Sequence, residues 1–246
     1  AMGAIVSTTV PYYTAVGDLG AIAYSTDFGK TWIYVSQFSF DSLQSVAYGY
    51  YPTSGNGLLV AVGYDQSLNP KIYRSTDSVN WSPAATAGNY QLYDVIFDNR
   101  TAAERWIAVG NNALIVTGSQ TGFLWSEGTI TVTGSTAGDV GYVFNKIIRS
   151  AGTVATYRYT VVGNNDTGNA GIWWSEDLLF PNQSPATTWN AATITPISII
   201  NISQAEPALV ITPTIHNLSD GQEIVLSGVV GMTEVNTNTY YVKSSG

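Results

Sequence analysis

Three aspartates recur at matching places in the chain. Asp27, Asp77 and Asp177 each follow a Ser by two residues and precede a Trp. Carboxylates of this kind could bind a metal ion or act as general acids if their side chains converged. They occur once per sequence repeat, so a stacked array of repeats would hold them far apart. We therefore interpret them as turn residues, whose oxygens accept hydrogen bonds from nearby backbone N–H groups.

The chain has a single histidine, His216, and no cysteine. The absence of cysteine excludes disulfides, thiolate metal sites and cysteine nucleophiles. No serine or cysteine nucleophile motif lies near His216, so we assign this residue to a loop rather than to catalysis. We expect no metal site, no cofactor and no catalytic group.

A short apolar strand that ends in a Val-Gly step occurs four times, at spacings of 46, 47 and 53 residues. A tryptophan follows each copy 15 to 26 residues later. A fixed period of this size marks a chain built from one supersecondary unit that stacks on copies of itself. The four Val-Gly steps are Val16-Gly17, Val62-Gly63, Val109-Gly110 and Val162-Gly163.

Each repeat contains four short segments of strand-forming residues separated by turns. Four antiparallel strands in about 40 to 50 residues are typical of a β-propeller blade. The strands expected in the second, third and fourth repeats are 45–48, 58–62, 72–75, 81–83, 93–97, 105–109, 113–117, 123–126, 144–149, 157–162, 171–175 and 189–192.

The first repeat has no obvious opening strand and begins effectively at residue 12. The β-branched segment 196–202 is the natural candidate to pair beside residues 12–16 and complete this blade. The alternative is a slice of a longer array, with its ring incomplete. The predicted fold is all-β, a propeller-like array of four or five four-stranded blades with a small C-terminal β-barrel-like module.

The turn before the first tryptophan, Ser25-Thr26-Asp27-Phe28-Gly29-Lys30-Thr31-Trp32, resembles the Asp-box motif of the sialidase-type (BNR-repeat) propellers. Segment 75–81 is similar but one residue shorter and lacks the glycine. Segment 175–189 is similar with a loop inserted, and 119–125 has Gln120 in place of the aspartate. The resemblance assigns a structural Asp-box role to Asp27, Trp32, Asp77, Trp81, Trp125, Asp177 and Trp189.

From about residue 203 the repeat ends. Segment 216–236 resembles a small β-barrel module, the FCCH-like domain of ubiquitin-activating enzymes, which also recurs in bacteriophage tail and virion proteins. Tyr240 and Val242 fall where that pattern has its last strand. We therefore divide the chain into a propeller-like domain, 4–202, and a C-terminal β module, 203–246. The residues expected in the small core of this module are Ile224, Val225, Val229 and Val242.

Nine Lys and Arg against 17 Asp and Glu give a formal net charge of −8. The cations are scattered, so we expect no nucleic-acid binding, because a phosphate backbone requires clustered cations. No run of 18 apolar residues occurs, and we expect no membrane insertion.

The Asp-box resemblance implies one function, a sialidase-like glycoside hydrolase or a carbohydrate-binding lectin propeller. Such hydrolases clamp a substrate carboxylate with three arginines, and none of the five arginines here lies in the motif that opens that family's site. The resemblance of segment 216–236 implies another function, which we prefer. On this hypothesis the chain is a non-enzymatic structural module of a bacteriophage virion or tail appendage. It would be located on the virion or extracellularly, with other virion proteins as partners.

A host-surface glycan or protein is the ligand that such a module could contact, and an oligomer is compatible with this role. Exposed aromatic rings rimmed with small polar residues suit sugar stacking or a protein contact. Neighbours on a strand face opposite ways, so one ring of each aromatic pair can be exposed, although we favour burial of both rings of Trp173-Trp174. The candidate binding residues are Tyr50, Tyr51, Trp173, Trp174, and, in the inserted loop 178–187, Phe180 and Asn182.

Overall fold

The chain folds into two compact units, Ala1–Ala192 and Thr193–Gly246. The computed structural model describes residues 2–6, 11–36, 41–51, 56–85, 88–99, 104–112, 115–119, 121–127, 130–132, 141–150, 158–165, 168–175, 187–192, 199–203, 209–212, 218–230, 233–236 and 238–243. Nearly every element in these ranges is a strand, and the one helical element among them is a three-residue 3-10 turn. The predicted all-β class is confirmed.

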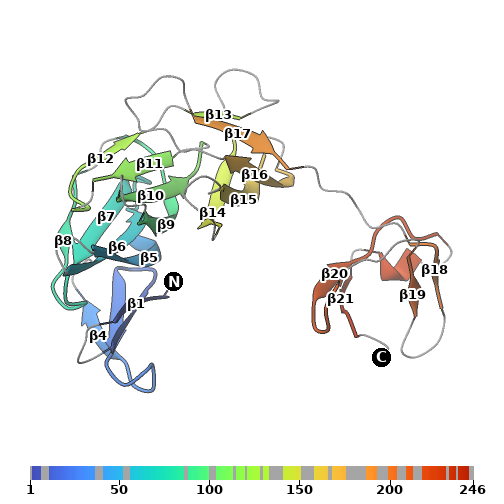
Figure 1. Ribbon diagram of the computed structural model, residues 1–246, viewed down its shortest axis with the longest axis horizontal. Helices are drawn as coiled ribbons and strands as arrows, with labels where there is room; N and C mark the ends of the chain where they lie inside the picture. The colour runs from blue at the N-terminus through green and yellow to red at the C-terminus, as the bar shows by residue number, and fades with distance from the viewer. Residues whose placement is uncertain are drawn as a thin grey trace. The chain divides into compact units, whose positions relative to one another are not determined.

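Four mainly antiparallel sheets follow one another along the first unit (Figure 1). In the first three sheets, and in the four antiparallel strands of the fourth, strands adjacent in sequence are adjacent in the sheet, which is how propeller blades are built. The first sheet comprises β1 (Met2–Val6), β2 (Pro11–Val16), β3 (Ala21–Ser25) and β4 (Ile33–Ser36); the second, β5 (Ser42–Tyr51), β6 (Asn56–Tyr64), β7 (Pro70–Ser75) and β8 (Ser82–Pro83); the third, β9 (Leu92–Asp98), β10 (Arg105–Gly110), β11 (Ile115–Gly118) and β12 (Trp125–Glu127). The fourth comprises β14 (Val143–Arg149), β15 (Tyr159–Asn164), β16 (Ala170–Ser175) and β17 (Thr187–Ala191), with β13 (Ile130–Val132) added parallel to β17.

The hydrophobic core of the first unit lies between neighbouring sheets, in three clusters. Successive residues of a strand face opposite sides of its sheet, so Ala61 packs toward the first sheet and Val62 toward the third. Because the third sheet is covered on both faces, every residue of β10 is buried. The apolar run that follows Arg105 in β10, Trp106-Ile107-Ala108-Val109, fits this two-sided burial.

In three of the four sheets, the glycine of the Val-Gly step lets the opening segment approach the second strand closely. A Cβ added to Gly63, Gly110 or Gly163 would lie 1.9, 1.8 or 1.7 Å from a carbonyl oxygen of that segment. At Gly17 the nearest atom to such a Cβ is 3.8 Å away, an ordinary contact. The repeated glycine is therefore a steric requirement of the second, third and fourth sheets.

The first sheet has an opening strand of its own. β1 pairs antiparallel with β2, and β3 occupies the other side of β2. The prediction that residues 196–202 complete this blade is wrong: Asn201–Ile202 form β18, which pairs with β19 (Val210–Ile211), and 196–198 lie outside the described residues. β1 was missed because its sequence, MGAIV, includes Gly and Ala and lacks the β-branched run that made 196–202 conspicuous.

The second unit, taken by itself, contains two small antiparallel sheets, β18–β19 and β20 (Glu223–Val225)–β21 (Thr239–Tyr241), with the 3-10 turn η1 (Thr233–Val235). The Asn236 side chain accepts a hydrogen bond from the Val229 N–H at 2.8 Å and donates one to its carbonyl at 2.9 Å. The predicted core position of Val225 is wrong, because strand alternation leaves its side chain 60% exposed. Leu226 is buried instead. No helix among the described residues is long and apolar enough to span a membrane.

Candidate functional site

The opening strands β5, β9 and β14 lie side by side and carry a row of polar side chains. Ser45, Asp94 and Lys146 occupy one register position in their sheets, each opposite the valine of the Val-Gly step. Asp94 Oδ1 accepts hydrogen bonds from the Ser45 hydroxyl at 2.7 Å and from Lys146 Nζ at 3.0 Å. Asp94 Oδ2 accepts one from the backbone N–H of Ile147 at 3.0 Å. One buried carboxylate thus links three sheets.

A second buried carboxylate, Asp98 at the end of β9, is the centre of an ionic cluster between the third and fourth sheets. Its Oδ1 accepts a hydrogen bond from Arg149 Nη1 at 2.8 Å, and its Oδ2 accepts one from the Tyr159 hydroxyl at 2.5 Å. Arg105 Nε lies 3.5 Å from Oδ2. Asp98, Arg105 and Tyr159 are buried. The cluster therefore provides the buried Asp98 carboxylate with hydrogen-bond and ionic partners. Tyr159 is itself buried, so a substrate in solvent cannot contact it in this structure.

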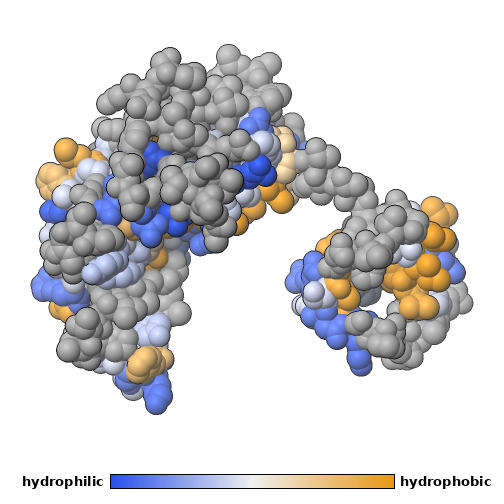
Figure 2. Space-filling view, in the orientation of Figure 1, coloured by the Kyte–Doolittle hydropathy of each residue, from blue (hydrophilic) through white to orange (hydrophobic). Residues whose placement is uncertain are grey.

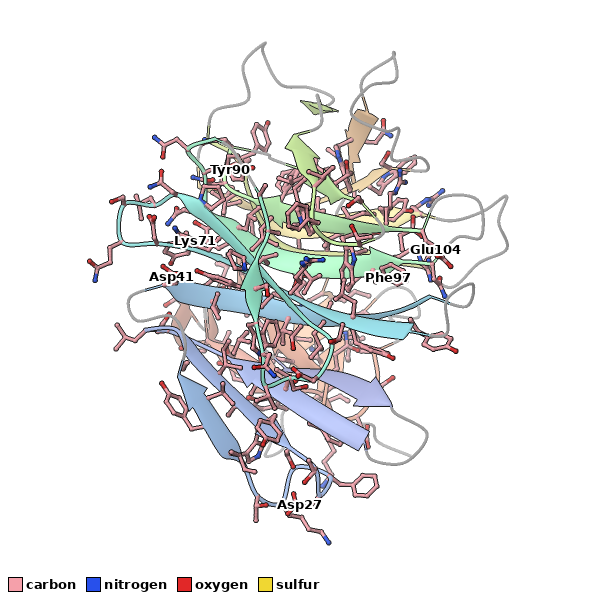
Figure 3. All side chains as sticks on the ribbon, turned by 90° about the vertical axis from the view of Figure 1, so that its left-hand side faces the viewer. Asp27, Asp41, Lys71, Tyr90, Phe97 and Glu104 are labelled. Atoms are coloured by element: carbon pink, nitrogen blue, oxygen red, sulfur yellow. The ribbon has the colours of Figure 1, made fainter. Side chains whose placement is uncertain are left out.

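The first Asp-box-like turn uses its carboxylate locally. Asp27 accepts hydrogen bonds from the Thr31 hydroxyl at 2.6 Å, the Thr31 backbone N–H at 2.8 Å and the Ser25 hydroxyl at 2.8 Å. These bonds, in that order of importance, lower the pKa of Asp27 to about 2. Figure 3 shows Asp27 in the turn at the tip of the first sheet, well apart from Phe97 on β9.

The second such turn is built in the same way around Asp77. Burial raises the pKa of Asp77, but hydrogen bonds from the Asn80 side chain, the Asn80 and Val79 backbone N–H groups and the Ser75 hydroxyl together lower it overall. Asp177 lies outside the described residues. The described parts of the chain hold no group of three or more Asp, Glu, His or Cys that could bind a metal.

Three of the four repeated tryptophans pack between sheets. In the first three turns the indole Nε1 donates to the carbonyl oxygen three residues earlier, at 3.1 Å from Trp32, 3.0 Å from Trp81 and 2.9 Å from Trp125. Trp81, Trp125 and Trp189 are buried, whereas Trp32 is 40% exposed. Trp32 differs because no sheet among the described residues of the first unit covers its ring.

The predicted binding residues come from different sheets. Tyr50, on β5, is half exposed. Trp173 is a core residue that contacts the rings of Tyr142 and Phe144, so its predicted stacking on a ligand is wrong. Trp174 is half-buried, with the Arg158 guanidinium 4.3 Å from its ring centroid. The Tyr51 side chain, Phe180 and Asn182 lie outside what the structure describes.

Sequence reasoning missed the polar row and the Asp98 cluster. The only available signal was positional: Ser45, Asp94 and Lys146 each precede an apolar residue at the same place in the opening strand of a repeat. An alignment of the repeats at these positions would have placed the three side chains in one row. Such an alignment would not have revealed the partners of Asp98.

No protein-family model matches the chain, and no curated protein matches it. Among solved structures the chain is similar to one described as "YCF48 bound to D1 peptide", with 15% sequence identity and a TM-score of 0.44. The match covers 82% of this chain and 57% of that one, so this chain spans little more than half the length of its structural neighbour. At this identity and TM-score the likeness assigns neither a family nor a ligand to the chain.

Proposed function

We propose that the chain is a non-enzymatic structural module of a bacteriophage virion or tail appendage, which contacts a host-surface glycan or protein. The resemblance of segment 216–236 to a module of phage tail proteins motivates this assignment. The observation that best supports a non-enzymatic role is the set of contacts that Asp98 makes. This carboxylate is buried and is held by two arginines and a tyrosine of its own chain.

The alternative, a sialidase-like hydrolase, requires arginines that converge on a substrate carboxylate. Here Arg105 and Arg149 both lie against Asp98. The Arg74 guanidinium lies 4.8 Å from the Phe123 ring centroid and donates a hydrogen bond to the Thr121 carbonyl at 3.3 Å. Protein groups thus engage three of the five arginines, and Arg100 lies outside the described residues. The engagement of these three cations favours the binding role over hydrolysis.

For binding, Tyr50 offers an exposed ring whose hydroxyl can donate or accept a hydrogen bond. This surface suits a sugar ring or a polar protein loop. On the fourth sheet, the Arg158 guanidinium lies over the Trp174 ring, on the same face as Ile172.

A glycan array and a fluorogenic sialoside assay on the purified chain test the proposal. We expect no turnover, and binding that Tyr50→Ala weakens more than Tyr50→Phe does. Tyr241→Ala, at an exposed tyrosine of the second unit, is the matched control and should leave binding unchanged. Sialoside turnover that is abolished by Arg74→Ala would overturn the proposal in favour of the enzyme. Antibody labelling of the parent particle tests the virion location.

A further inference from the structure

Each sheet of the first unit presents a Val–Ile pair on the face that points toward the next sheet. The valine belongs to the Val-Gly step on the second strand, and the isoleucine lies opposite it on the third strand. The pairs are Val16–Ile22, Val62–Ile72, Val109–Ile115 and Val162–Ile172.

The first three pairs are buried against the following sheet. Each contributes to a cluster with two apolar residues of the next opening strand, such as Leu43 and Val46 of β5. Among the described residues of the first unit, no following sheet covers the fourth pair. Val162 is 41% exposed, Ile172 is 38% exposed, and Ile148 beside them is also exposed. Figure 2 shows hydrophobic surface, in orange, over the region of β14–β16.

The first sheet is uncovered on its other face, the one that points away from the second sheet. In the second sheet, the face toward the preceding sheet is formed by Leu59, Ala61, Tyr73 and Trp81, all of which are buried. By register and repeat, the equivalent residues of the first sheet are Tyr13, Ala15, Ala23 and Trp32. None of these four is buried.

These two uncovered faces are the two halves of an interface that the chain already forms three times. Figure 1 shows the first and fourth sheets at opposite ends of the array within the first unit, so the two faces do not meet within one copy. We propose that the face of Ile148, Val162 and Ile172 docks on the face of Tyr13, Ala15, Ala23 and Trp32 of a second copy. The contact is head-to-tail, because two different patches meet, and it continues the sheet stacking from one copy into the next.

Sedimentation equilibrium of the full chain, without any glycan, tests this association separately from the proposed function. We expect the chain to self-associate reversibly. Ile172→Asp on one face and Trp32→Asp on the other should each weaken association about tenfold or more, because each places an unpaired charge in an apolar contact. Ile172→Thr, a milder change, should weaken it in the same direction, and circular dichroism verifies that each variant is folded.

Mixing provides the sharpest test. Ile172→Asp and Trp32→Asp each keep one intact face, so a mixture of the two variants should form a heterodimer even though neither associates well alone. Val225→Asp, at an exposed valine of the second unit, is the control and should not change association. A wild-type chain that stays monomeric at every concentration, or a mixture that does not associate, would overturn the proposal.

Discussion

The middle and end sheets of the first unit are built from the same repeat but differ in burial. Trp81 in the second sheet is 7% exposed, whereas its counterpart Trp32 in the first is 40% exposed. Val62 is fully buried, whereas its counterpart Val162 is 41% exposed. These apolar side chains are therefore buried only where a neighbouring sheet packs on them. The sequence of the repeat alone does not bury them, as in other arrays in which each unit contacts only its neighbours.

The largest expected effect comes from breaking the Asp98 cluster between two stacked sheets. Asp98→Ala should lower the free energy of unfolding by about 3–5 kcal/mol, because it leaves the buried Arg105 guanidinium without its Asp98 partner. Lys71→Ala, which removes a more exposed ion pair with Asp65 of 3.2 Å, should cost at most about 1 kcal/mol. Urea unfolding followed by tryptophan fluorescence measures both. Equal losses would contradict a role for Asp98 in joining the sheets.

A smaller effect is expected from the Val-Gly steps. Gly110→Ala should cost about 1–3 kcal/mol, because its Cβ would meet a backbone carbonyl that cannot move without shifting the opening segment of the third sheet. Gly17→Ala, the matched change in the first sheet, should stay within about 0.5 kcal/mol. The same unfolding experiment compares the two. A Gly17→Ala loss as large as that of Gly110→Ala would show that the glycines serve something other than this close approach.

The smallest effect concerns the Asp27 turn, whose hydrogen bonds are local and need no neighbouring sheet. The pKa of Asp27 is lowered to about 2 in the folded chain from an ordinary value of 3.8. Its contribution to stability is therefore present above about pH 4 and is lost as the pH falls toward 2. Thr31→Val removes the hydroxyl that lowers the pKa most, so the pKa should rise toward the ordinary value. A carboxyl NMR titration measures it, and an unchanged pKa would contradict the assignment.

Much of the fold was predictable from the sequence. All four strands of the second, third and fourth repeats lie close to their predicted positions, because two-sided burial produces apolar runs bounded by turn residues. The strand β13 was missed, since its parallel pairing with β17 joins segments more than fifty residues apart. Asp98 was missed for a similar reason, because its partners Arg149 and Tyr159 lie 51 and 61 residues away along the chain. Local patterns carry no information about such pairs.

The equivalent isoleucines of the four sheets test the dependence of burial on stacking most directly. Ile22, Ile72, Ile115 and Ile172 occupy one register position; the first three are buried against the following sheet, whereas Ile172 is 38% exposed. Each should be changed to alanine, and the free energy of unfolding measured at a concentration where sedimentation shows single copies. We predict losses of about 2–5 kcal/mol at the first three positions. We predict a loss below about 1 kcal/mol at Ile172, whose side chain is partly in water already. Equal losses at all four positions would contradict the account.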